Sequence, residues 1–511
     1  MDLELIRKKT EGIKCVCKDK KLYEEKTEMI VPDNSPDIYR IIRGQGNVFL
    51  KDKSVSEGKV SLSGNISGVV LYIAEGETKV RKLRINIPIS YTVDCDGVGQ
   101  TSKVVAYICL RGFDAKEINP RKVSVRASVE VEVSSYESCE MNVCEAVTES
   151  EKYGICLRKN KIDVFYPSYV CEKSFVIGDD LELSSAEQEM TEIVFSSVNV
   201  LVNDVKVIGN KAIVKGNTEI SYVYELENGA LEAMEKELPF SQIIDMTDCA
   251  EESTPEIRLS VSGYELEPQF DGAGKARFLG INVSVDAFAM GYIKSTVSAV
   301  DDAYSTKYNI GIIWEKNSYE KVRNKLEKRV ATTETIEAGN SIKRILDMSV
   351  ELLPVTRRRE EGGEVLSGEA LVSVLYMGED DLIYNTHRRF SVVCPIPISE
   401  NGKYETVASV RGKSYSVGVN NDINVRFFTD FEIIETEAEV VETISAISVD
   451  EEENRSGNLP SLKVKRLERD YDIWNLAKEN LTTVEEIKLA NGITDESSLC
   501  RGRIVLIPRK V

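Results

Sequence analysis

Residues Val60–Tyr72, with the sequence VSLSGNISGVVLY, recur twice in the chain at a constant spacing of 152 residues. The second copy, Ala212–Tyr224, reads AIVKGNTEISYVY, and the third, Glu364–Tyr376, reads EVLSGEALVSVLY. The glycine at the fifth position and the tyrosine at the last position align in all three copies without a gap. An upstream pair of apolar residues, three positions apart, keeps the same spacing as Ile38 and Ile41, Met190 and Ile193, and Ile342 and Ile345. The chain therefore contains three copies of one domain.

The length of the repeat bears on the kind of protein. A unit of about 150 residues is too long for a solenoid, whose units have roughly 20–50 residues. Each copy has the size of an ordinary globular domain and can bury a core of its own. Because an enzyme seldom needs three copies of its reaction site, the repetition favours a scaffold that multiplies a binding surface.

Alternation of apolar and polar residues predicts that the repeated stretch is a β-strand with one buried face. Three further runs, at residues 84–93, 123–133 and 424–433, are rich in β-branched and aromatic residues, which strands favour. Asp-Gly and Asn-Gly pairs between such runs are typical of antiparallel hairpins. We therefore expect a mainly β protein in which each copy is an antiparallel sandwich or an open barrel.

Capping residues before each apolar pair predict a short helix in every copy. In the first copy Ser35 can cap the helix, Pro36 suits its first turn, and Gly44 ends it, so we expect a helix over about residues 36–43. The corresponding starts are near Ser184 and Ser341.

The repeats divide the chain into domains near residues 12–160, 161–310 and 311–448. The last strand is expected to end near Ile447, followed by a mobile acidic linker at residues 449–461 and a separate module at residues 462–511. Residues 464–511 contain nine Lys or Arg and eight Asp or Glu. The acidic charge of the chain therefore lies in the repeats and the linker.

Composition narrows the class of partner and the compartment. The 511 residues are 42% hydrophobic, which suits several folded cores, and the net charge of −20 argues against nucleic acid or an anionic membrane as the main partner. No run approaches the roughly 20 apolar residues of a membrane span, and the first residues lack the apolar core of a signal peptide. Eleven cysteines without a repeating spacing fit reduced thiols. We therefore expect the chain to stay in the cytosol.

No motif in the sequence predicts catalysis, a metal ion or a cofactor. His387 is the only histidine, and Cys15-x-Cys17 lacks the paired spacing of a zinc site. Residues 271–275 lack the spacing of a phosphate-binding loop and fit a hairpin turn. The prediction is a non-enzymatic protein with no catalytic, metal-binding or cofactor-binding residues.

The C-terminal residues predict the element order βααβ. Strands are expected at residues 463–467 and 503–508, and a helix at residues 473–480. Thr482 and Glu485 are spaced as a capping box that opens a second helix through Ala490. With the motifs Ile473-Trp474-x-x-Ala477, Val484–Gly492 and Leu499–Pro508, this order closely resembles a LysM module.

The LysM resemblance implies a binding groove. Such modules usually bind N-acetylglucosamine polymers between the loop before the first helix and the loop before the last strand. Here the first loop reads DYDIW at residues 470–474 in place of the family pattern Gly-Asp-Thr-Leu-Trp, and its acidic, bulkier rim would suit a protein partner. We assign partner binding to Tyr471, Ile473, Trp474, Lys478, Asn491 and Leu499. The alternative for Trp474 is that it only supports the small core of the module.

The first repeat resembles the SPOCS domain of spore-coat-associated proteins. The resemblance rests on residues 28–38, with Pro32-Asp33 and Pro36-Asp37-Ile38, and on residues 58–72, whereas the other two copies lack the Pro-Asp elements. Tandem SPOCS-like copies followed by a LysM module look like the SipL-like family of spore coat morphogenetic proteins of clostridia. The resemblance covers nearly the whole chain.

What this resemblance implies is an adaptor in spore coat assembly, in the mother-cell cytoplasm at the forespore surface. Its LysM module would bind the coat morphogenetic ATPase (SpoIVA-type), and its repeats would bind other coat proteins or one another. One alternative is a cell-wall protein that binds peptidoglycan or N-acetylglucosamine, and another is an accessory part of a wall hydrolase. Lack of a signal peptide disfavours both, because a cytosolic chain does not meet the wall glycan.

Overall fold

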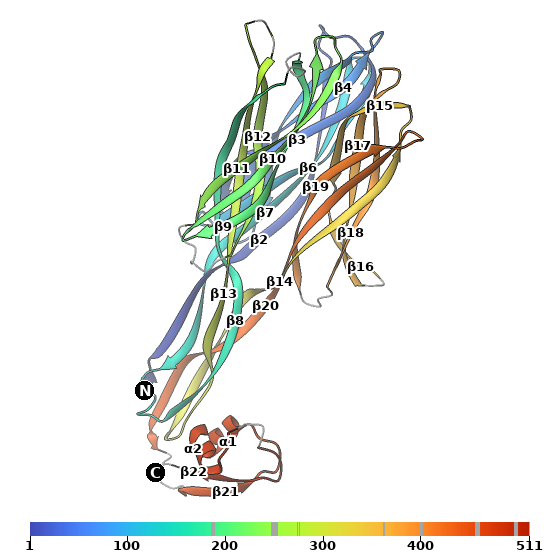
Figure 1. Ribbon diagram of the computed structural model, residues 1–511. Coiled ribbons are helices and arrows are strands. Elements are labelled where there is room, and N and C mark those ends of the chain that lie inside the picture. The colour runs from blue at the N-terminus through green and yellow to red at the C-terminus, as the bar shows by residue number, and fades with distance from the viewer. Residues whose placement is uncertain are drawn as a thin grey trace.

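The computed structural model describes residues 1–184, 190–246, 254–272, 274, 276–360, 363–397, 402–454, 460–494 and 499–509. Three sets of long antiparallel strands form the body, and two short helices lie near the C terminus (Figure 1). The first set contains β2 (Leu5–Ile30), β3 (Ile38–Ser56), β4 (Lys59–Ala74), β5 (Val80–Asp94), β6 (Lys103–Asn119) and β7 (Lys122–Val147). The second contains β8 (Ile155–Glu182), β9 (Met190–Ile208), β10 (Lys211–Leu226), β11 (Leu231–Asp245), β12 (Thr254–Phe270) and β13 (Ala276–Ser305).

The third set follows the same order with one break. It contains β14 (Tyr308–Glu337), β15 (Ile342–Leu352), β16 (Thr356–Glu360), β17 (Gly363–Gly378), β18 (Ile383–Ile396), β19 (Lys403–Val417) and β20 (Asp422–Asn454). Here β15 and β16 together take the place of β3 and β9, since both pair with β17. The short strand β1 (Asp2–Leu3) joins the edge of β20.

Each set folds into two antiparallel sheets that share one core. In the first set the sheets have the orders β3-β4-β5 and β2-β7-β6, and in the second β9-β10-β11 and β8-β13-β12. The strands that carry Gly64, Gly216 and Gly368 are the central strands of equivalent sheets. The mainly β, antiparallel fold predicted from the sequence is confirmed, and the sandwich is the form that it takes.

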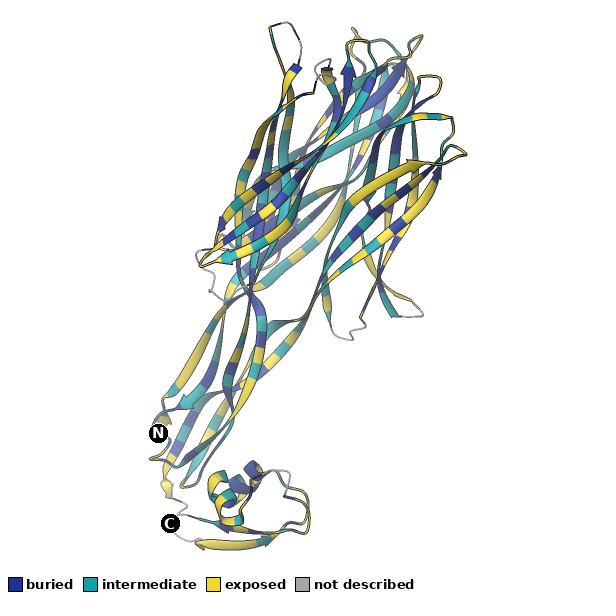
Figure 2. Ribbon diagram, viewed as in Figure 1, coloured by how far each residue is buried: buried dark blue, intermediate teal, exposed yellow. Residues whose placement is uncertain are grey.

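Strict alternation explains why these residues form strands with one buried face. Along β5, Ile85, Ile87, Ile89, Tyr91 and Val93 are buried, while the residues between them are exposed. Figure 2 shows the same alternation of buried and exposed bands along most strands. A single-residue shift in register would turn every one of these apolar side chains to solvent.

The predicted helix over residues 36–43 is wrong, because Ile38–Ser56 is the strand β3. The apolar spacing of three has another cause. Ile38 pairs with Ala74 and Ile41 pairs with Tyr72, and the extra residue between them is a β-bulge. Side chains on one face of a regular strand are an even number of residues apart. The one extra residue in the bulge allows Ile38 and Ile41, three residues apart, to lie on the same core face.

The other two copies repeat this bulge. Met190 and Ile193 pair with Leu226 and Tyr224, and Ile342 and Ile345 pair with Gly378 and Tyr376. The third-copy helix predicted near Ser341 is therefore also a strand start. The start of the second-copy helix falls largely on residues 185–189, outside the described residues.

The repeated glycine faces a second irregularity in the neighbouring strand. A Cβ atom on Gly64 would overlap the carbonyl oxygen of Phe49, and one on Gly216 would overlap that of Leu201. In both copies the neighbouring strand has an extra, unpaired residue at this point. In β3 it lies between Leu50 and Asp52, and in β9 it lies between Val202 and Asp204. In the third copy the neighbouring strand is interrupted at this point between β15 and β16. Glycine is needed because the bulged backbone approaches too closely for a side chain.

Replacing Gly216 with Ala should therefore destabilise the chain by about 1–3 kcal/mol, since the new methyl group overlaps backbone that cannot rotate away. Chemical denaturation monitored by circular dichroism measures the change. Gly263→Ala is the matched control, because that strand glycine has no atom within 4 Å of a built Cβ. Equal midpoints for the two variants would contradict the close-approach explanation.

The bulges also build a common centre where the three repeats meet. The residues at the second bulge of each copy, Ile42, Val194 and Leu346, are spaced by 152 residues and belong to one apolar cluster. The same cluster contains Leu71, Val223 and Leu375, which are also equivalent. Equivalent residues can meet in this way only if the three sandwiches are arranged around a pseudo-threefold axis.

One polar group lies at this centre, and its members are again equivalent. Arg43, Phe195 and Asp347 are spaced by 152 residues, and the Arg43 Nη1 atom lies 2.7 Å from Asp347 Oδ2. The Arg43 guanidinium also donates to Ser349 Oγ at 2.7 Å and lies 5.5 Å from the ring centroid of Phe195. The three copies have thus diverged into a cation, an aromatic ring and an anion at one position.

The longest strands extend beyond the sandwiches and form a stalk (Figure 1). Three strand pairs, β2–β7, β8–β13 and β14–β20, supply it. Its core includes Val147, Ile155, Val300, Ala303, Ile444 and Ile447. Strand β20 runs to Asn454, so the predicted strand end at Ile447 is too early, because Ile447 and Val449 are buried in the stalk. Of the predicted linker, residues 455–459 lie outside the described part of the chain.

The C-terminal module has the predicted order βααβ. It consists of β21 (Leu462–Arg466), α1 (Ile473–Asn480), α2 (Val484–Asn491) and β22 (Ile504–Pro508), and β21 pairs with β22. Both helices lie within one or two residues of their predicted ranges.

Candidate partner-binding site on the C-terminal module

Local capping fixes the two helices that carry the predicted site residues. Asp472 caps α1 by accepting a hydrogen bond from the backbone N–H of Trp474 at 3.2 Å. The capping box of α2 pairs Thr483 with Glu486, so the box predicted at Thr482 and Glu485 lies one residue too early. Leu481, with φ of 53°, ends α1.

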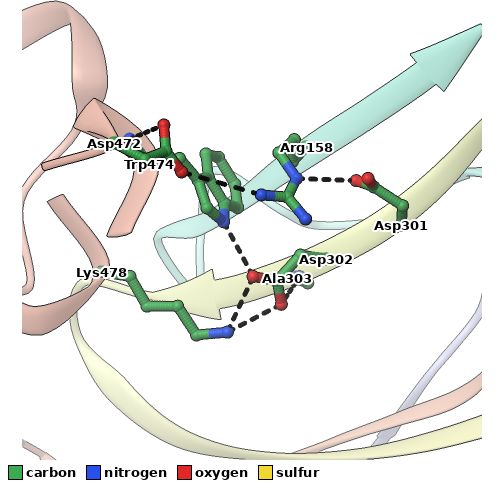
Figure 3. Close-up of polar contacts among 7 residues, drawn as sticks. All are labelled: Arg158, Asp301, Asp302, Ala303, Asp472, Trp474 and Lys478. Atoms are coloured by element: carbon green, nitrogen blue, oxygen red, sulfur yellow. Dashed lines mark hydrogen bonds and ion pairs between the residues drawn. The ribbon is translucent and has the colours of Figure 1, made fainter. Parts of the chain in front are cut away.

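One face of α1, with Trp474 and Lys478, rests against the tip of the stalk. The Trp474 indole Nε1–H donates to Asp302 Oδ2 at 2.8 Å, and Lys478 Nζ donates to both carboxylate oxygens of Asp302 at 2.7 and 2.8 Å (Figure 3). Asp302 lies in β13 of the second repeat. One carboxylate therefore holds two side chains that are one helical turn apart.

Neighbouring groups complete the contact. The Tyr304 ring packs edge-on against Trp474 with centroids 4.9 Å apart, and its hydroxyl donates to the carbonyl oxygen of Thr482 at 2.7 Å. The Arg158 guanidinium lies 5.8 Å from the ring centroid of the indole and donates to Asp301 Oδ1 at 2.9 Å. Figure 3 shows Arg158 between Asp301 and Asp472.

Electrostatics favour the ionised form of Asp302. Burial alone raises the pKa of this carboxyl group, but the hydrogen bonds from Lys478 and Trp474 outweigh burial and bring its pKa below the ordinary value. Burial raises the pKa of the Tyr304 hydroxyl, which remains a neutral donor to Thr482.

Acidification should release the module from the stalk. Because docking lowers the pKa of Asp302, the contact is strongest above the ordinary carboxyl pKa of about 4 and weakens as the pH falls through the lowered pKa. Trp474 fluorescence in a Trp314→Phe background would report the release. An acid transition of the same shape in an Asp302→Ala variant would contradict this assignment.

The structure places the six predicted site residues in different environments. Trp474 and Lys478 share the contact with Asp302. Ile473 and Leu499 are buried in the module core, and the Asn491 side chain bonds both backbone groups of Leu506, at 2.5 and 2.7 Å. Tyr471 is half-buried, and the ammonium of Lys465 lies 4.6 Å from its ring centroid. A role of these residues in binding a partner stays a prediction.

Sequence reasoning did not identify the acceptor side of this contact. Arg158, Asp302 and Tyr304 lie on strands of the second repeat, far from the module in sequence, and Asp302 precedes Trp474 by 172 residues. The available signal was the Asp301-Asp302 pair, which interrupts the apolar alternation of a long strand. That pattern alone names no partner.

A second surface of the module faces solvent. Leu462 and Val464 of β21 and Ile504 and Leu506 of β22 are exposed. Since Val464 pairs with Leu506, and since alternate residues share a face, the four side chains lie on one side of the small sheet.

The structure is that of a multidomain β protein. Three sandwiches lie around one pseudo-threefold axis, and a small βααβ module lies at the end of the stalk. Residues 37–118 and 161–268 match the family model described as SipL, SPOCS domain. These two segments, which lie in the first and second repeats, are therefore similar to the SPOCS domain of the SipL family. Comparisons with curated proteins and with solved structures gave no match. Similarity to this family suggests a role in spore coat morphogenesis.

Two searches of the described residues concern other classes of site. None of the helices in the described ranges is long and apolar enough to cross a membrane. Within the same ranges, no three His, Cys, Asp or Glu side chains are grouped so that they could hold a metal ion.

Proposed function

We propose that this protein is a non-enzymatic adaptor that links coat components at the forespore surface, on the mother-cell side. In this proposal the C-terminal module is a LysM module that binds the coat morphogenetic ATPase, and the SPOCS repeats bind other coat proteins. The observation that carries the proposal is the SPOCS match over two successive repeats. The domain division is part of the proposal, with SPOCS-like repeats near residues 12–160, 161–310 and 311–448 and the LysM module at 462–511, the last repeat being extended to the end of β20 at Asn454.

The shape of the protein supports a linking role. Strands of 26 to 33 residues run from the sandwiches into the stalk, so the two ends of the molecule are joined by continuous hydrogen-bonded sheet. At about 3.3 Å per residue such strands reach roughly 85–110 Å. A module at one end and three sandwiches at the other can therefore hold two partners apart at a fixed distance.

A pull-down from sporulating cells tests the proposal. We expect the full chain to capture the coat ATPase and a chain without residues 462–511 to lose it while still capturing other coat proteins. Binding of chitin oligomers is measured on the full chain in parallel. Retention of the ATPase by the truncated chain, or tight chitin binding by the full chain, would favour a different function for the module.

A further inference from the structure

The stalk segment that contacts the module has the chemistry of a peptide ligand. Asp302-Ala303-Tyr304 is the extended end of β13, so the side chains of Asp302 and Tyr304 point to the same side. The carboxylate accepts hydrogen bonds from Trp474 and Lys478, and the tyrosine ring packs on the same indole. The module thus contacts a carboxylate and, two residues later, an aromatic ring.

The module side of this contact shields the carboxylate from water and holds the aromatic residue in place. Trp474 is only 8% exposed, and the Asp302 side chain only 14%, so the charged hydrogen bonds are largely shielded from water. Charge-assisted hydrogen bonds of this kind are stronger than neutral ones. The Tyr304 hydroxyl adds a hydrogen bond to the backbone carbonyl of Thr482, which fixes the position of the aromatic residue on the module.

We propose that the Trp474–Lys478 face recognises an extended segment with a carboxylate two residues before an aromatic ring. In the docked chain Asp302-Ala303-Tyr304 occupies this face as an intramolecular competitor. The external ligand is a protein partner that presents the same carboxylate-x-aromatic segment and displaces the stalk. That this partner is the coat ATPase rests on the function proposed above, whereas the specificity of the face does not.

Tethering sets the expected size of the competition. Because the module is tethered to the stalk, the stalk segment competes at an effective concentration in the millimolar range. The docked chain therefore binds an external segment more weakly than an undocked chain does. Removing the Asp302 carboxylate should raise the affinity for an external segment on the order of tenfold, a typical coupling between two binding events.

The test uses a labelled peptide with the sequence of residues 300–305, VDDAYS, and the full chain. Fluorescence anisotropy should show weak binding to the unmodified chain and about tenfold tighter binding to the Asp302→Ala variant. Adding Lys478→Met to Asp302→Ala should abolish the gain. Asp163→Ala, an exposed acid on the same strand pair, is the matched control and should leave the affinity unchanged. Circular dichroism verifies that each variant is folded, and Asp302→Asn provides a second, isosteric variant.

Two results would overturn the proposal. One is equal peptide affinity for the unmodified chain and for both Asp302 variants. The other is undiminished binding of a peptide in which the carboxylate at the Asp302 position is replaced by an amide. Failure of the proposed function is separate, because it would appear as loss of ATPase capture with the peptide results intact.

Discussion

Trp474→Glu should abolish capture of the coat ATPase by the full chain and separate the module from the stalk, while both helices stay folded. A glutamate at this position places a carboxylate opposite Asp302, where the indole N–H donates in the docked chain. Tryptophan is a frequent hot-spot residue in protein interfaces, and its loss costs at least about 2 kcal/mol, or roughly thirtyfold in affinity. The measurement is the amount of ATPase captured, combined with circular dichroism at 222 nm.

Trp314→Glu is the matched control for this substitution. Trp314 is the second tryptophan of the chain, lies on β14 and is 43% exposed, so the same change there should leave ATPase capture intact. The alternative is that Trp474 mainly supports the core of the module, in which it clusters with Leu476 and Ile487. Loss of a fully buried tryptophan would cost about 3–5 kcal/mol and unfold the module. A loss of helical signal with Trp474→Glu would therefore contradict the interface assignment.

The module was predictable because its structure is encoded locally. Asp472 and Thr483 cap helices that begin one residue later, and the closing strand alternates between exposed Ile504 and Leu506 and buried Val505 and Ile507. Such signals lie within a few residues of the element that they specify. The one-residue error in the capping box arose because Thr482 and Thr483 are adjacent and both have an acid three residues later.

The strand that carries the first apolar pair of each repeat was not predictable from spacing alone. Ile38 and Ile41 fit one face of a helix and equally fit one face of a strand with a β-bulge between them. What decides between these is the pairing with Ala74 and Tyr72, which lies more than 30 residues away in the sequence. Local pattern and long-range pairing conflict here, and the pairing prevails.

The docking site depends on even longer separations. Asp302 becomes an acceptor for Trp474 only after the second repeat has placed the end of β13 at the tip of the stalk. The polar centre has the same origin, since Arg43 and Asp347 are 304 residues apart. The spacing of 152 residues was visible in the sequence, but a pseudo-threefold arrangement was needed before it predicted a contact.

Arg43→Ala should destabilise the protein by about 3–5 kcal/mol, because it leaves Asp347 buried without a compensating charge. Both side chains are almost fully buried, at 5% and 8% exposure, and the lost guanidinium also bonds Ser349. The ion pair joins the first repeat to the third, so the loss should appear as a lower unfolding midpoint of the body of the chain. Guanidinium chloride denaturation measures it.

Replacing both charged partners at once separates the ion pair from the packing around it. Replacing Arg43 with Met and Asp347 with Leu removes both charges and keeps apolar volume beside Phe195, so this pair of changes should be close to neutral or stabilising. Arg81→Ala, which breaks the more exposed ion pair with Glu77 in the same repeat, is the control and should cost no more than about 1 kcal/mol. If Arg43→Ala costs no more than Arg81→Ala, the polar centre does not hold the repeats together. A large cost for the single change and a small one for the double change would instead indicate that the charges specify which repeats meet at the axis, because the cation and the anion occupy equivalent positions in different repeats.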